Sequence, residues 1–225
     1  SYVLAYTISN YCGESDVDSV MIGFAPAAVS YCGNVTEITY EGQTYHTVQI
    51  GDQCWLKENL NEGQMIDGNT IQSDNSTLEK YCYNNEPDSC SAYGGLYQWN
   101  ELMQYSGQPG AQGICPEGWH IPTDYDWCLL VSELDPEADC LTNISQTAGG
   151  KLKETGYEHW NFGNEGATNE SGFTAVGSGS KGDFFYNIRE TGEYVTSTRR
   201  TEGEFFIRHM SSYGPWITRG YYPVT

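Results

Sequence analysis

Positive charge is scarce in this chain. Ten Lys and Arg residues stand against thirty Asp and Glu residues, which gives a formal net charge of -20 at pH 7. A field of this sign repels polyanions, so nucleic acid and anionic membrane surfaces are excluded as partners. The chain also has no run approaching the ~20 consecutive apolar residues that a membrane-spanning helix needs. We therefore expect no membrane insertion.

Internal repeats are absent too, which excludes solenoids and propellers. The 225 residues suffice for one large or two small domains. Aromatic residues make up 14% of the chain, with eighteen Tyr and six Trp. This is more anchoring surface than a disordered acidic segment carries, so we expect a folded chain with a real core.

The eight cysteines include no Cys-x-x-Cys pair of the zinc or redox type. Their even number favours disulfides, which persist in oxidising compartments, so we expect a secreted, extracellular or cell-surface protein. No signal sequence opens the chain, and on this interpretation Ser1 is the mature N-terminus after signal cleavage. The expected disulfide residues are Cys12, Cys32, Cys54, Cys82, Cys90, Cys115, Cys128 and Cys140.

Candidate glycosylation sites agree with this compartment. Residues 18–20 resemble a short bacterial O-glycan acceptor pattern centred on Ser19. Four Asn-x-Ser/Thr sequons also occur, as expected for extracellular surface loops. Their asparagines are Asn34, Asn75, Asn143 and Asn169.

The first part of the chain predicts a β-hairpin and two helices. Residues 35–40 and 44–50 alternate in polarity around a glycine turn, which indicates a hairpin. A short helix is predicted around residues 96–103, between two glycine-containing segments. A stronger helix follows Pro122, because Thr123 and Asp126 have the spacing of a capping box. Its apolar face comprises Trp127, Leu130, Val131 and Leu134.

The last sixty residues predict strands separated by Gly-containing turns, around residues 184–186, 194–196, 205–207 and 216–217. A hairpin, two helices and terminal strands in this order argue for the α+β class. Residues 1–34 carry two apolar stretches, 2–8 and 20–29, and form an N-terminal extension whose apolar side chains must be buried somewhere.

Three segments carry a family resemblance. They read QIGDQCWLKENLN at residues 49–61, YGGLYQWN at 93–100 and CPEGWHIPT at 115–123. Together they closely resemble the Fibrobacter succinogenes major paralogous domain, a module of secreted and surface proteins of Fibrobacter and Bacteroidota-type bacteria. The resemblance implies one domain over residues 35–225, preceded by the apolar extension 1–34 as an edge or exchanged strand.

The resemblance also implies a fold. The family is similar to the C-type-lectin-like and formylglycine-generating-enzyme-like folds, with a small twisted antiparallel sheet, two short helices, long ordered loops and disulfides. Family members commonly end in a strand whose cysteine pairs with the cysteine matching Cys115. Here the last five residues stop just before that position, which leaves Cys115 to another partner such as Cys54. Sequence proximity then predicts the remaining pairs, which are Cys12 with Cys32, Cys82 with Cys90, and Cys128 with Cys140.

Calcium is the one metal that the sequence favours. The histidines lack the spacing of a zinc site. A glycine-rich loop and a following aspartate instead offer hard oxygen ligands, which suit calcium. These candidate ligands are Asn161, Asn164, Glu165, Glu170 and Asp183.

Enzymatic motifs are lacking. No Gly-x-Ser-x-Gly elbow occurs, and the matched segments supply no recognisable cysteine pair of the formylglycine-generating type. Residues 86–88 resemble the Glu-Pro-Asn sugar triplet of C-type lectins, but they precede both predicted helices, and we interpret the match as coincidence. Trp119 and His120 are interpreted as a packing corner with the imidazole bonded to backbone.

Three functions remain open. The first is a secreted, non-enzymatic structural or adhesive surface subunit that self-assembles into filaments through residues 1–34. The second is a monomeric lectin-like module that binds polysaccharide through acidic loops and aromatic side chains. The third, an enzyme of the formylglycine-generating type, rests on fold analogy alone.

Overall fold

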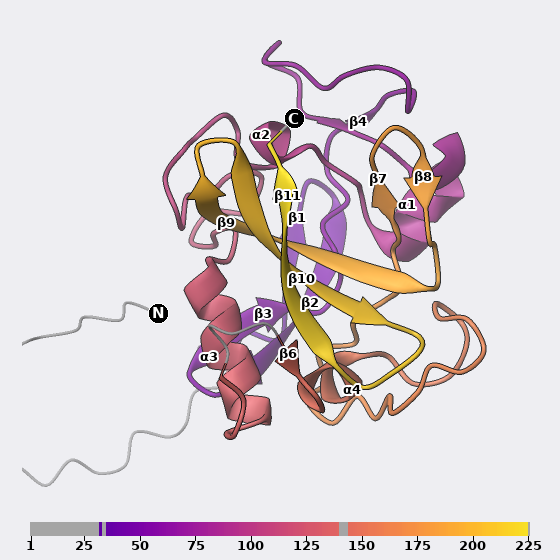
Figure 1. Cartoon of the computed structure of the whole chain (residues 1–225). Helices are drawn as coiled ribbons and strands as arrows, with labels where there is room; N and C mark the ends of the chain where they lie inside the picture. The colour runs from indigo at the N-terminus through magenta and orange to yellow at the C-terminus, as the bar shows by residue number, and fades with distance from the viewer. Residues whose placement is uncertain (1–31, 33–34, 140–143, 225) are drawn as a thin grey trace, which may run out of the picture.

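The computed structural model of the chain describes residue 32 and residues 35–139 and 144–224 (Figure 1). Several expectations lie outside these residues. They concern the strand within residues 1–31, the glycosylation candidates Ser19, Asn34 and Asn143, and the cysteines Cys12 and Cys140.

The N-terminal sheet is an antiparallel meander of β1 (Glu37–Tyr40), β2 (Gln43–Ile50) and β3 (Gln53–Leu56). Glu41 and Gly42 connect β1 to β2, and both have positive φ angles, 45° and 85°. Two left-handed residues match the twist of a tight hairpin, and glycine adopts this conformation without strain. The predicted hairpin is therefore confirmed.

The C-terminal sheet has the strand order β6-β11-β10-β9. Its long strands are β9 (Thr191–Thr201), β10 (Glu204–Ser211) and β11 (Ile217–Pro223), and β6 (Ile144–Ser145) adds two residues at one edge. Figure 1 shows these orange and yellow strands in front of the violet β1-β2 hairpin. The predicted β-rich character of the last sixty residues is confirmed.

Short elements connect the two sheets. β4 (Gln64–Met65) pairs in parallel with β5 (Glu79–Lys80), and β7 (Ser180–Lys181) pairs in antiparallel with β8 (Phe185–Tyr186). A single 3-10 turn, η2 (Tyr83–Asn85), precedes the first helix. Long ordered loops therefore make up much of the described chain.

The predicted capped helix is α3 (Asp124–Leu134). The Thr123 hydroxyl accepts from the Asp126 amide, and the Asp126 carboxylate accepts from the Thr123 amide, so the capping box is present as predicted. The other helix, predicted around residues 96–103, is shorter in the structure and forms one turn, α2 (Trp99–Leu102).

Two further helices were not predicted. Helix α1 (Pro87–Tyr93) begins at a proline, which is well suited to the first helical position. The triplet at residues 86–88 is thus a helix start. Helix α4 (Ala148–Leu152) contains Gly149 and Gly150, which disfavour helix in isolation. A Cβ at Gly149 would overlap the Trp216 carbonyl oxygen, so close packing explains this glycine.

The core consists of two apolar clusters. The first gathers α3, α4 and the inner ends of both sheets around Trp127, Trp160 and Met210. The second surrounds α2 and contains Trp99, Phe205 and Ile207. Both sheets and the helices share these clusters, which establishes the α+β class. No helix in the described ranges has the length and apolar character to cross a membrane.

The disulfides correct two of the expected pairs. Cys82 pairs with Cys90 as predicted, but Cys32 pairs with Cys54, so the pairs Cys12–Cys32 and Cys54–Cys115 were wrong. The β1-β2-β3 meander brings residue 32 beside β3, where its amide donates to the Gln49 side chain. Cys115 is a free, buried thiol, and Cys128 is disulfide-bonded.

Candidate functional site

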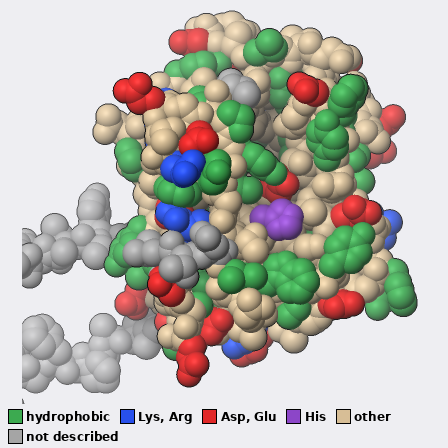
Figure 2. Space-filling view, in the orientation of Figure 1, with side chains coloured by type: hydrophobic (Ala, Val, Ile, Leu, Met, Phe, Trp, Pro, Cys, Tyr) green, Lys and Arg blue, Asp and Glu red, His purple; other side chains and the backbone are tan. Residues whose placement is uncertain are grey.

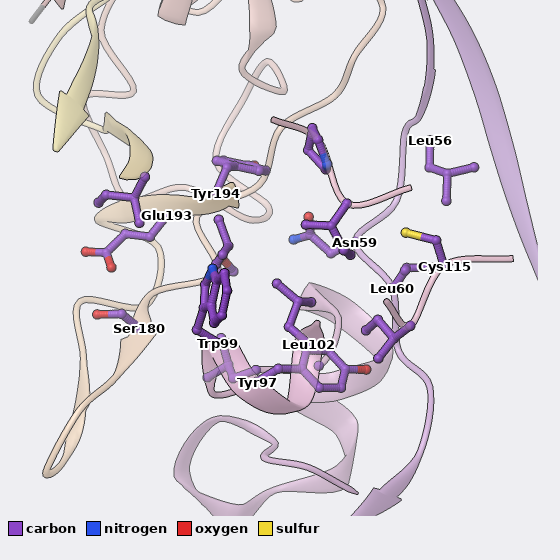
Figure 3. Close-up of a pocket in the computed structure, with 18 of the residues that line it drawn as sticks. Leu56, Asn59, Leu60, Tyr97, Trp99, Leu102, Cys115, Ser180, Glu193 and Tyr194 are labelled. Atoms are coloured by element: carbon purple, nitrogen blue, oxygen red, sulfur yellow. The ribbon is translucent and has the colours of Figure 1, made fainter. Parts of the chain in front are cut away.

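A cavity of about 1840 Å³ lies between the two sheets and α2. Ligand pockets for small molecules typically measure ~300–1,000 Å³, so this one is large enough for a polymer segment. Both core clusters contribute to its walls. Figure 3 shows Tyr97, Trp99 and Leu102 between Glu193 and Tyr194 on one side and Asn59, Leu60 and Cys115 on the other.

Polar groups are spaced among these aromatic side chains. The Glu193 carboxylate accepts from the Tyr222 hydroxyl at 2.9 Å, and burial raises the pKa of this carboxyl above its usual value. Asn59 donates to the Tyr93 carbonyl oxygen and is fixed by it. The walls thus combine aromatic faces with hydrogen-bonding groups held in place, as ligand pockets do.

The outer edge of β11 is the second feature of the site. β11 pairs with β10 along its whole length, but β6 pairs only with Ile217 and Thr218. In the described ranges, residues 219–223 of β11 have no strand partner on their outer side. An unpaired edge of this kind is a template for strand addition.

Each face of this edge borders a hollow. Tyr222 and Pro223 line the large cavity. A smaller groove of about 540 Å³ lies beside Tyr221, Phe206 and Ile144. Tyr221 is 50% exposed, and successive strand residues point to opposite faces. The edge is therefore flanked by a large hollow on one face and a small one on the other.

Basic side chains gather beside the small groove. Arg200 stacks on Tyr221 at 3.9 Å from the ring centroid, and Arg219 stacks on Phe206 at 3.7 Å. Figure 2 shows Lys and Arg side chains gathered among hydrophobic ones on this face. Both guanidinium groups are also paired with carboxylates, Arg200 with Glu204 at 2.6 Å and Arg219 with Asp124 at 2.8 Å.

A buried charge cluster fixes α3 to the C-terminal sheet. The Asp124 carboxylate accepts from Arg208 at 2.8 Å and from the Nη2 and Nε atoms of Arg219 at 2.8 and 3.0 Å. Asp124 is also the first residue of α3, where a negative charge favours the helix dipole. The cluster holds β10 and β11 in register with the helix.

Lys153 is a second buried cation. Its ammonium group donates to the carbonyl oxygens of Glu165, Ser211 and Gly214 at 3.0, 2.8 and 2.9 Å. It also lies 5.3 Å from the centroid of the Trp160 ring. Burial lowers the pKa of Lys153 to about 8. One side chain thereby ties the loop at Glu165 to the end of β10 and to the turn that follows it.

The side chains predicted to bind calcium have other contacts in the structure, and calcium binding stays a prediction. No group of three or more His, Cys, Asp or Glu side chains in the described ranges is placed to hold a metal ion. Glu170 faces Lys151 at 3.8 Å. Asn164 donates to the carbonyl oxygens of Glu154 and Gly156. The Glu165 carbonyl oxygen accepts from the Lys153 ammonium group.

Three other predicted positions lie on the surface or near it. Asn75 is exposed, and the half-buried Asn169 hydrogen-bonds to Thr174. Glycosylation at both stays a prediction. His120 is exposed and lies 3.2 Å from the Asp126 carboxylate. Its predicted bond to backbone was wrong, because the capping carboxylate of α3 is the nearer acceptor.

The sequence patterns predicted neither the cavity nor the open strand edge. Residues 93–99 have a high density of aromatic side chains, and that density was the available signal. Nothing in the sequence indicates that Tyr194 and Glu193 face them from β9. Such contacts join positions about a hundred residues apart, and local patterns carry no record of them.

These features define a disulfide-bonded α+β domain with two sheets around an aromatic cavity. The chain belongs to the family described as the Fibrobacter succinogenes major domain, whose model matches residues 48–217. The resemblance stated above is thereby confirmed. No curated protein and no solved structure matches the chain.

Proposed function

We propose that this chain is a secreted, non-enzymatic structural or adhesive subunit that assembles with copies of itself by strand addition. Residues 2–8 of one copy would pair with residues 219–223 at the open edge of β11 in the next copy. The observation that carries this proposal is the unpaired β11 edge with a hollow on each face. Main-chain pairing supplies affinity in such complexes, and pockets for alternate side chains supply specificity.

The sequence of residues 2–8 fits the two hollows. Tyr2, Leu4, Tyr6 and Ile8 would face one side of an added strand, and Val3, Ala5 and Thr7 the other. The large side chains match the cavity of about 1840 Å³, and the smaller ones match the groove of about 540 Å³. A head-to-tail contact of this kind need not close, so its product is a filament.

Other properties support the compartment and the lack of enzymatic activity. The disulfides Cys32–Cys54 and Cys82–Cys90 favour an oxidising compartment. Burial raises the pKa of Cys115 to about 12, which is unfavourable for a cysteine nucleophile. An exposed sequon at Asn75 is compatible with a glycoprotein. The order of hairpin, helices, long loops and antiparallel strands supports, as part of this proposal, a C-type-lectin-like arrangement.

Deleting residues 1–10 tests the assembly. The parent should form filaments in negative-stain electron microscopy, and the deletion variant should stay a folded, disulfide-bonded monomer by light scattering. Filaments of the deletion variant, or a parent that is monomeric at high concentration, would contradict the proposal.

A matched pair of variants tests the acceptor edge. Tyr221→Asp places a charge beside the edge and should abolish assembly. Tyr213→Asp makes the same change on the 62% exposed Tyr213, which lies between β10 and β11 and outside the edge. This control should assemble like the parent. Equal behaviour of the two variants would remove β11 from the proposal.

A further inference from the structure

Three buried polar atoms, on residues that line the large cavity, have no hydrogen-bond partner in the described part of the chain. They are the indole nitrogens of Trp55 and Trp127 and the side-chain oxygen of Gln53. All three residues line the cavity, and Trp127 is only 1% exposed. Buried indole N–H groups normally donate to a partner, and unsatisfied buried groups are rare in folded proteins.

The apolar surroundings of these atoms form an aromatic box. The Trp55 and Trp127 rings lie 5.0 Å apart, and Phe173 lies 5.9 Å from each of them. Tyr194 lies 5.5 Å from Trp127 and closes the group. Water would satisfy the polar atoms but would leave the edges of these rings in contact with an unfavourable solvent.

The chemistry required of a ligand follows from these groups. It must accept hydrogen bonds from two indole donors, donate one to a carbonyl oxygen and cover aromatic surface with C–H groups. An anionic ligand is disfavoured by the net charge of -20 and by Asp126, which binds the Gln53 amide at 3.4 Å. A neutral sugar ring combines hydroxyl groups with apolar faces and meets all of these requirements.

Access and size fit the same class. Asp52, Gly118 and His120 line the cavity and are exposed, so this end communicates with solvent. The volume of about 1840 Å³ exceeds that of a small-molecule pocket and suits several linked sugar rings. We infer that Gln53, Trp55 and Trp127 form a binding subsite for a neutral polysaccharide. The subsite lies at the α3 end of the cavity and does not depend on the proposed strand addition.

Binding of defined oligosaccharides to the full chain tests this inference. Cellohexaose and mannohexaose are the neutral probes, and hexagalacturonate is the anionic control. Titration calorimetry and tryptophan fluorescence should show saturable binding of at least one neutral probe and weaker binding of hexagalacturonate. No binding of either neutral probe at millimolar concentration would mean that the cavity holds water only, and would overturn the inference.

Two variants assign the binding to the subsite. Trp127→Phe removes the indole donor and keeps an aromatic ring, and Gln53→Met removes the acceptor on the half-buried strand β3. Each should weaken binding about tenfold, the equivalent of one hydrogen bond. Trp119→Phe is the control, because Trp119 lines the cavity but has no such unsatisfied atom among those described. Unchanged affinity of the folded Gln53→Met variant would overturn the subsite whatever the stability of Trp127→Phe.

Discussion

Replacing Asp124 by asparagine should be among the most destabilising conservative changes in the chain. The carboxylate is 7% exposed, and its partners Arg208 and Arg219 are 3% and 18% exposed. The amide would offer one acceptor oxygen in place of two and would turn an N–H₂ group toward a guanidinium. Two buried cations would then lack the anion that neutralises them.

The magnitude follows from this burial. Removing one partner of a buried ion pair costs about 3–5 kcal/mol. For a chain of this size each kcal/mol lowers Tm by about 2–4 °C, so Tm should fall by about 6–20 °C. Thermal unfolding followed by circular dichroism measures this shift.

Asp88→Asn is the matched control. Asp88 is an exposed residue in the first turn of α1, and its loss removes about 1 kcal/mol or less of helix-dipole stabilisation. A second variant, Asp124→Asn with Arg219→Gln, should recover part of the lost stability, because it removes one of the two unneutralised cations. A loss in Asp124→Asn no greater than in Asp88→Asn would refute this account of the cluster.

Three further predictions concern titratable groups. Burial lowers the pKa of Lys153 to about 8, whereas the value in the unfolded chain is near 10.5. Between these pH values the unfolded chain binds more protons, so the free energy of unfolding should rise with pH, by about 3 kcal/mol in all. Lys153→Met should abolish this rise, as measured by denaturant titrations. Burial raises the pKa of Tyr45, Tyr97 and Tyr194, so above pH 10 the unfolded chain loses protons first and stability should fall steeply. Because burial raises the pKa of the Cys115 thiol, iodoacetamide should alkylate it only after denaturation. Peptide mapping should recover Cys32 linked to Cys54. A peptide with Cys54 linked to Cys115 would contradict the structure.

Local sequence patterns correctly predicted the elements that depend on contacts between residues close together in the chain. The capping box of α3 and the hairpin at Gly42 depend on residues within a few positions of each other, and both are present. Helix α4 was missed because its two glycines argue against helix, and tertiary packing against Trp216 outweighs that preference.

The site depends on contacts between distant segments, which sequence proximity cannot rank. Cys32 lies 20 residues from Cys12 and 22 from Cys54, so spacing alone gives almost no preference between the two partners. The meander decides it by placing residue 32 beside β3. The contact of the Glu165 carbonyl oxygen with Lys153, the C-terminal cap of α4, could not be predicted for a similar reason.

That lysine has a consequence for how the loops respond to their surroundings. A bound metal ion leaves when it is diluted or chelated, and loops that it organises become disordered with it. The Lys153 ammonium group likewise binds three backbone carbonyl oxygens, but it is covalently part of the chain. A chelator or a change in metal-ion concentration cannot remove it, so these contacts respond to pH, through the pKa of Lys153 at about 8, and not to the metal content of the water.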